Sequence, residues 1–200
     1  GMGGGYTSPY VGVPGGSGGG AGGYPSGSSG GTSSGDPFPG NPADTSPTNG
    51  WGYDGGDSTP DNVAQGAGGG GAGGEGVPQQ KSASPTTYGL GGTGIQLPAT
   101  FTNPNGSFGT SGPNPGGYYV AGGGNGGGYP APAPQTGNPA AASTVPIGGG
   151  GLGAATGPSP VTNATPGMVN TGSGGGGVSP TYTQAPGNGG SGLVLIAYPT

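Results

Sequence analysis

The stretch GAGGGGAGGEG, residues 66–76, consists of glycine apart from two alanines and one glutamate. The whole chain holds 61 glycines and 25 prolines in 200 residues. Spacers rich in Pro, Ser, Thr, Asn and Tyr separate the glycine pieces at irregular intervals, which indicates an array of similar pieces rather than a strict solenoid repeat. Further glycine pieces lie at 1–6, 12–23, 89–94, 121–128, 148–153, 172–177 and 187–192.

A chain of this composition buries little apolar surface, so disorder is the default expectation. Charged residues make up only 4% of the chain, however, whereas disordered chains are usually rich in charge. Collagen requires glycine at every third position, and the doublets and triplets of glycine break that pattern. Flexible linkers fit the composition and form a second interpretation.

The third interpretation is a bundle of polyproline-II helices. This helix has about three residues per turn and no internal hydrogen bonds, so its N–H and C=O groups point outward. Glycine lets neighbouring helices approach closely enough to bond to one another, with Cα–H···O contacts in addition. The predicted fold class is therefore an irregular, glycine-rich bundle or sandwich of polyproline-II helices, with a few short β-strands and essentially no α-helix.

Helices are not expected, because Gly or Pro interrupts nearly every turn and no window carries apolar residues at helical spacing. Strands are expected within GIQLPATF (94–101), GYYVAG (117–122) and LVLIAY (193–198). The last run is apolar on both faces, so we expect a terminal strand that is covered on both sides by the glycine layers. The chain is expected to form a single domain, 1–200, with a loop insertion at 24–65.

Four motifs follow one another in the chain: GLGGTGIQLPATF (89–101), GGYYVAGGGNGGG (116–128), NTGSGGGG (170–177) and GNGGSGLVLIAYP (187–199). In this order they resemble the glycine-rich C-terminal domain of tailed-bacteriophage tail-fibre and adhesin proteins, of the polyproline-II sandwich type. The resemblance covers residues 66–200. Two departures are Val120, which is inserted in the second motif, and Ala197, where the family often carries arginine.

The resemblance implies a virion protein outside the cell, at the distal part of a longer tail fibre or in its cap. Its spacers would form loops that recognise a bacterial surface receptor, a polysaccharide or an outer-membrane protein, and attach the phage to its host. Other tail-fibre subunits are implied as partners: either three copies associate as a homotrimer or one copy caps a trimeric fibre. The alternative is a purely structural virion protein, a fibre segment or capsid decoration, without a ligand. An ice-binding bundle would need a flat array of regularly spaced threonines, and none is visible.

The charge and the missing residue types argue against several functions. Lys81 is the only cation beside six acidic residues, so no basic cluster is present for nucleic acid or an anionic membrane surface. The longest apolar run, 193–198, is far shorter than the roughly 20 residues that span a bilayer, so no membrane insertion is expected. The chain has no histidine and no cysteine, which removes the usual nucleophile and base pairs. Neither enzymatic activity nor a cofactor is expected.

The stretch TNGWGYDGGD, residues 48–57, is the best candidate for receptor binding. Its aromatic side chains offer flat apolar faces beside hydrogen-bond acceptors, a combination that suits sugars or exposed protein loops. The candidate receptor-binding residues are Asn49, Trp51, Tyr53, Asp54, Asp57, Phe38 and Tyr129. The alternative for Trp51 is that it seals the edge of the glycine bundle from water.

The stretch DGGDSTPDN, residues 54–62, spaces three acidic residues among oxygen-rich neighbours, which could suit Ca²⁺. It lacks the ligand spacing of a calcium loop. The simpler interpretation is a polar turn whose aspartates bond to nearby backbone N–H groups. No bound metal is therefore predicted, with Asp54, Asp57 and Asp61 as the fallback candidate.

Overall fold

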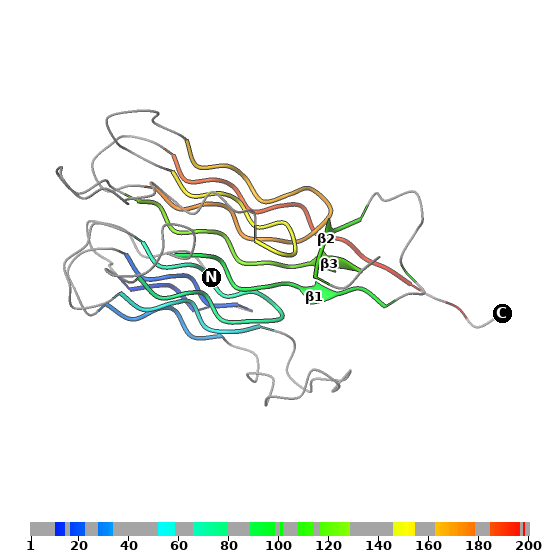
Figure 1. The fold of residues 1–200 in the computed structure, drawn as a ribbon, viewed down its shortest axis with the longest axis horizontal. Coiled ribbons are helices and arrows are strands. Elements are labelled where there is room, and N and C mark those ends of the chain that lie inside the picture. Colours follow the sequence, from blue (N-terminus) through cyan, green and yellow to red (C-terminus); the bar gives the residue numbers. More distant parts are fainter. Residues whose placement is uncertain are drawn as a thin grey trace.

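The chain forms extended segments that run side by side, with a small sheet toward one end (Figure 1). The computed structural model describes residues 11–14, 17–22, 28–33, 52–58, 66–79, 89–98, 101, 108–113, 117–128, 146–154, 163–178, 185–196 and 198. These residues contain no α-helix and only a few short strands. The prediction of an irregular, essentially non-helical fold is confirmed at this level. None of the described residues forms a helix long and apolar enough to cross a membrane.

The sheet is antiparallel, with strand order β1-β3-β2. Strand β3, Tyr118–Val120, lies in the centre between β1, Ile95–Gln96, and β2, Thr110–Ser111. Ile95 pairs with Val120 and Ser111 pairs with Tyr118. The sequence predicted the regions of β1 and β3, whereas β2 was not predicted.

The glycine segments are joined by backbone hydrogen bonds that repeat every third residue. In the segment 66–72, one set of N–H groups faces 121–127, a second set faces 18–21, and a third faces 74–77. Gly66, Gly69 and Ala72 donate to Gly127, Gly124 and Ala121 over 2.7, 3.0 and 2.9 Å. Ala67 and Gly70 donate to Ala21 and Gly18 over 3.0 and 2.8 Å, and Gly68 and Gly71 donate to Val77 and Gly74 over 3.0 and 2.9 Å. Successive residues therefore point to three different neighbours.

The same spacing recurs with parallel neighbours. The segment 122–128 runs in the same direction as 148–154: Gly122, Asn125 and Gly128 donate to Gly148, Gly151 and Ala154 over 3.2, 2.9 and 2.9 Å. Gly151 and Ala154 in turn donate to Gly174 and Gly177, each over 2.8 Å. Each segment can thus have parallel and antiparallel neighbours at once, so the core is assembled from main-chain groups.

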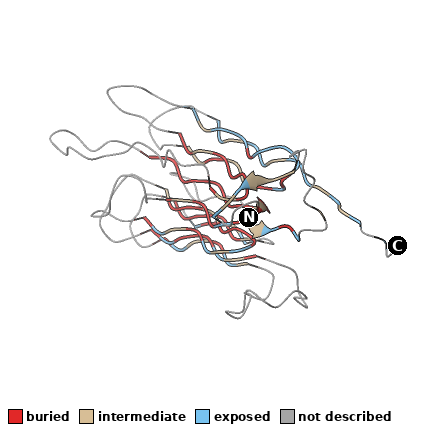
Figure 2. Ribbon diagram, turned by 45° about the vertical axis from the view of Figure 1, so that its right-hand side comes forward, coloured by how far each residue is buried: buried red, intermediate tan, exposed pale blue. Residues whose placement is uncertain are grey.

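Close approach of the backbones explains why most of these positions are glycine. A Cβ atom on Gly68 would overlap the carbonyl oxygen of Leu90, and one on Gly123 would overlap the carbonyl oxygen of Gly69. The buried apolar residues of the described part are few, and four of them are alanines: Ala21, Ala67, Ala72, Ala154, Leu97 and Tyr119. Figure 2 shows buried backbone running along the inner segments.

Residues 28–33 and 52–58 are segments of this core, contrary to the expectation that 24–65 is a loop insertion. Gly55 donates to Gly31 over 3.0 Å, and Gly56 donates to Gly68 over 2.8 Å. Glycine doublets in these short pieces supply the same close approach as the longer runs. They are too short to stand out from the spacers by composition, which is why the sequence did not separate them.

The expected terminal strand at 193–198 is not formed among the described residues 193–196 and 198. The expectation that both of its faces are covered is wrong, because Val194, Ile196 and Tyr198 are largely exposed. These residues form an arm that extends beyond the core toward the C-terminus (Figures 1 and 2). A strand requires a partner for its main-chain groups, and the described residues place no partner strand beside this run.

The core has two distinct ends. At the sheet end, Gly73 donates to Thr93 and Gly94 donates to Ile147, close to β1. At the opposite end, here called the spacer end, hydrogen bonds join residues at or near the first or last position of many segments. These bonds are Ser58 to Ser28, Gln79 to Asp57, Gly66 to Gly127, Gly126 to Gly89, Ala154 to Gly177 and Gly187 to Gly176.

Candidate functional site

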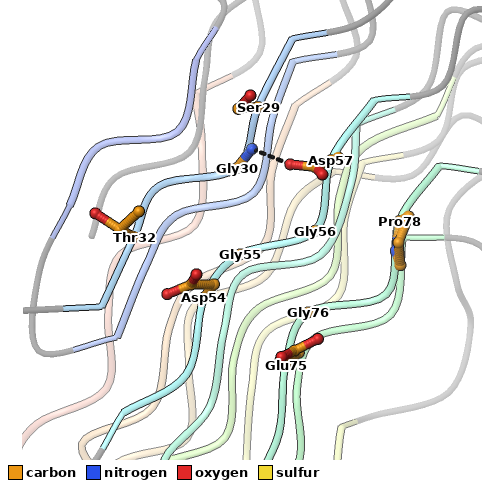
Figure 3. A pocket seen from close by; sticks show the side chains of 10 residues that line it. All are labelled: Ser29, Gly30, Thr32, Asp54, Gly55, Gly56, Asp57, Glu75, Gly76 and Pro78. Atoms are coloured by element: carbon orange, nitrogen blue, oxygen red, sulfur yellow. Dashed lines mark hydrogen bonds between the residues drawn. The ribbon is translucent and has the colours of Figure 1, made fainter. Parts of the chain in front are cut away.

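An open groove of about 260 Å³ lies over three neighbouring segments, 28–33, 52–58 and 74–79. On each segment, the two side chains that line the groove are three residues apart. Together they form two rows that run across the three segments (Figure 3). One row holds Thr32, Asp54 and Glu75, and the other holds Ser29, Asp57 and Pro78. All six are exposed, and the glycines between them form the floor.

The order of the segments follows from main-chain hydrogen bonds. Ser58 donates to Ser28 over 2.8 Å, which fixes segment 52–58 beside 28–33 in antiparallel orientation. Gly76 donates to Asp54 and Gln79 donates to Asp57, each over 3.0 Å, which fixes 74–79 on the other side in parallel orientation. Residues three apart on each segment therefore face the same side, and the rows of the groove follow from the period of the core.

The aspartates of the groove also tie two segments together. Asp57 Oδ1 accepts the N–H of Gly30 over 2.7 Å, and Asp54 Oδ1 accepts the N–H of Ser33 over 2.6 Å. One oxygen of each carboxylate is thus engaged with backbone, while the side chains remain exposed to the groove. Their positions are set by the scaffold rather than by a loop.

The groove is a surface of hydrogen-bond acceptors. Carboxylates accept hydrogen bonds, and the hydroxyls of Ser29 and Thr32 both donate and accept. No lysine or arginine is among the lining residues. Such a surface suits ligands rich in hydroxyl groups or carrying positive charge, and it repels anions.

The structure describes three of the seven predicted receptor-binding residues. Asp54 and Asp57 lie in the groove. Tyr53 is half-buried, and its N–H donates to Gly71 over 3.0 Å, so it belongs to the sheet end of the same segment. The other four, Phe38, Asn49, Trp51 and Tyr129, lie outside the described residues.

The sequence did not single out Ser29, Thr32 or Glu75. The available signal was spacing: Ser29 and Thr32 are three residues apart, as are Asp54 and Asp57. In segments whose hydrogen bonds repeat every third residue, such pairs share a face. Which segments are neighbours depends on chain topology, and no local pattern of the sequence contains that information.

The described residues hold no group of three or more acidic, His or Cys side chains arranged to bind a metal ion. Of the fallback calcium candidates, Asp54 and Asp57 are separated into the two rows of the groove, and Asp61 lies outside the described residues. The interpretation that the aspartates bond to backbone N–H groups agrees with the bonds to Gly30 and Ser33, although the partners are on a neighbouring segment.

The chain was compared with protein-family models, with curated proteins and with solved structures, and none of the three comparisons finds a match.

Proposed function

We propose that the core is a bundle of polyproline-II helices. Support comes from the period of three in the hydrogen bonds, which equals the repeat of that helix. The overlap that a Cβ atom on Gly68 or Gly123 would make with a neighbouring carbonyl adds to it. A coil without internal hydrogen bonds must bond to its neighbours, and only a glycine-rich coil can do so on several sides.

We further propose that the protein is the tip domain of a phage tail fibre, a non-enzymatic adhesin of the virion that binds a bacterial surface receptor. The observation that carries this proposal is the convergence of segment ends at the spacer end. Five spacers both leave and re-enter the core there: 23–27, 59–65, 80–88, 155–162 and 179–184. A rigid scaffold that presents many short connections at one end is the arrangement that recognition domains use.

The groove gives this proposal a ligand class. Ser29, Asp57 and Pro78 each lie one residue from the end of a described segment at the spacer end, so one row of the groove lies at that end of the core. Its carboxylates and hydroxyls favour a polyhydroxylated ligand. We therefore propose a bacterial surface polysaccharide, rather than an outer-membrane protein, as the receptor.

The candidate residue Trp51 directly precedes Gly52, a described residue at the sheet end of the core. Gly52 precedes Tyr53, whose carbonyl accepts the N–H of Gly18 over 2.9 Å at the sheet end. Spacer 34–51 thus leaves and re-enters the core away from the spacer end. The two groups of spacers can be tested separately.

The test is binding of the purified chain to intact bacteria and to an array of purified bacterial surface polysaccharides. One variant replaces spacers 59–65, 80–88 and 179–184 by Gly-Ser sequences of equal length, and a matched control replaces 34–50. We expect the first variant to lose binding and the control to keep it, a result that would exclude the sequence candidates Phe38 and Asn49 from the receptor site. Binding that survives the first replacement would contradict recognition through these spacers, and a wild-type chain that binds neither bacteria nor polysaccharides would favour a purely structural virion protein without a ligand.

A further inference from the structure

The segment 185–192 is an edge of the described core. Gly187 and Gly190 donate to Gly176 and Ser173 over 2.9 and 2.8 Å. The carbonyl of Asn188 accepts from Gly167 over 2.8 Å, and Ser191 bonds to 170–172, so among the described residues the bonds of this segment reach only 167–176. The inner segment 66–73, by contrast, bonds on all sides. One side of 185–192 therefore faces solvent, and most of its residues are exposed.

For two glycines of this edge, the described residues show no close backbone contact that would require glycine. A Cβ atom on Gly192 would meet nothing within 4 Å, and one on Gly189 would meet only the Ser173 carbonyl oxygen at 3.4 Å. By contrast, a Cβ atom on Gly187 would overlap the Thr165 carbonyl oxygen. Gly189 and Gly192 are three residues apart, so they share one face of a threefold coil. That face admits another backbone at the short distance found throughout the core.

An exposed apolar surface continues directly from this edge. Val194, Ile196 and Tyr198 are 83%, 67% and 80% exposed. Met168 and Val169 are also exposed, and the neighbouring Asn170 N–H donates to Ser191 Oγ over 2.8 Å, which places them beside the start of the arm. These five residues and Val11 are the large hydrophobic residues that the described part of the chain exposes.

The charge distribution indicates what covers this surface. All seven charged residues lie between Asp36 and Lys81, and residues 82–200 carry no charged side chain. The chain has a net charge of −5, so two copies repel each other through most approaches. Contact through the edge 185–198 keeps the acidic side chains of two copies apart. This edge has no charged side chain of its own, so it offers no ionic contact to a charged partner.

We propose that the edge 185–198 packs against a second copy of this chain. The Gly189 and Gly192 face receives a glycine coil of the partner, as the glycine coils inside the core receive one another. The arm then buries its apolar side chains against the partner, where an extended segment gains main-chain partners by strand addition. Closed symmetry gives a dimer or a trimer. This association does not rest on receptor binding, and either can hold without the other.

Sedimentation velocity over a wide range of protein concentrations tests the association of the full chain. We expect a discrete dimer or closed trimer at high concentration that dissociates on dilution. A chain that stays monomeric throughout, or that associates without a limiting size, would overturn the proposal.

Three substitutions locate the contact. Val194→Asp and Gly192→Val should each weaken association by about tenfold or more, because they place a charge or extra bulk in the interface. Val11→Asp is the matched control, since Val11 is also exposed, at 48%, and lies outside the edge. Thermal unfolding of each variant at low concentration should match the wild-type monomer. If the edge variants associate like the wild type, or if Val11→Asp weakens association equally, the edge is not the interface.

Discussion

The side-chain oxygen Oδ1 of Asn125 accepts the backbone N–H of Gly91 over 2.8 Å in the interior of the core. Asn125 is one of the two largest fully buried side chains in the described residues. Its own N–H donates to Gly151, and its carbonyl accepts from Gly177. A side-chain amide thus takes the place of a peptide group between two glycine segments.

Replacing Asn125 by alanine should destabilise the fold. The change leaves the Gly91 N–H buried without this acceptor, which costs about 1–3 kcal/mol of unfolding free energy. The midpoint of urea unfolding measures this. Asn188→Ala is the control, because Asn188 is exposed, and it should change stability by less than about 0.5 kcal/mol. Equal midpoints for the two variants would show that the buried amide contributes nothing.

Adjacent glycines of one segment should respond in opposite ways to alanine. Gly68→Ala drives a methyl group into the Leu90 carbonyl, so we expect a loss of about 3 kcal/mol or more, or failure to fold. A Cβ atom on Gly69 would lie 3.7 Å from its nearest neighbours, which is an ordinary contact. Gly69→Ala should therefore be neutral or stabilising by up to about 1 kcal/mol, since alanine restricts the unfolded chain. Similar losses for both variants would contradict close backbone packing at Gly68.

Calorimetry should show an unusually small heat-capacity change on unfolding. Exposure of apolar surface raises this quantity and exposure of polar groups lowers it, and ordinary domains give about 12–15 cal/mol/K per residue. The described core buries peptide groups and alanines, with Leu97 and Tyr119 as the larger buried apolar residues. We expect a value per residue clearly below the ordinary range. A value inside that range would mean that an apolar core of normal size drives folding.

The groove should contribute directly to receptor binding. Glu75→Gln and Asp57→Asn keep the shape of the side chains and, for Asp57, an oxygen that can accept from the Gly30 N–H. Loss of charge halves the strength of hydrogen bonds from sugar hydroxyls, so each change should weaken polysaccharide binding several-fold. Binding titrations of the two variants beside Asn188→Ala measure this. Unchanged affinity in both groove variants would remove the groove from the receptor site.

The sequence predicted the general fold because the governing property is local. Runs such as 66–74 can pack closely only if they lack side chains, and aromatic or β-branched residues at 118–120 favour a strand. The segments 28–33 and 52–58 were missed because two adjacent glycines in a polar stretch also fit a turn. Their place in the core depends on neighbours far along the chain, such as Gly68 beside Gly56.

The candidate site was predicted in part for the same reason. Asp54 and Asp57 were named because they are hydrogen-bond acceptors close to the aromatic residues Trp51 and Tyr53, whereas Glu75 joins them in the groove only through the pairing of Gly76 with Asp54. The arm at 193–198 shows the opposite error. Its residues favour a covered strand, but coverage depends on a partner that the sequence of one chain does not specify.

Amide hydrogen exchange, resolved by residue, is the most direct test of the claim that glycine main-chain groups form the core. The amides of Gly68, Gly70, Gly92 and Gly123 each donate to another segment over 2.8–3.0 Å. We predict that these four exchange slowly and together, with a free energy of opening close to that of global unfolding. Exchange at the rate of an unstructured peptide, while Tyr119 in the sheet stays protected, would show that the glycine segments are not the core of this protein.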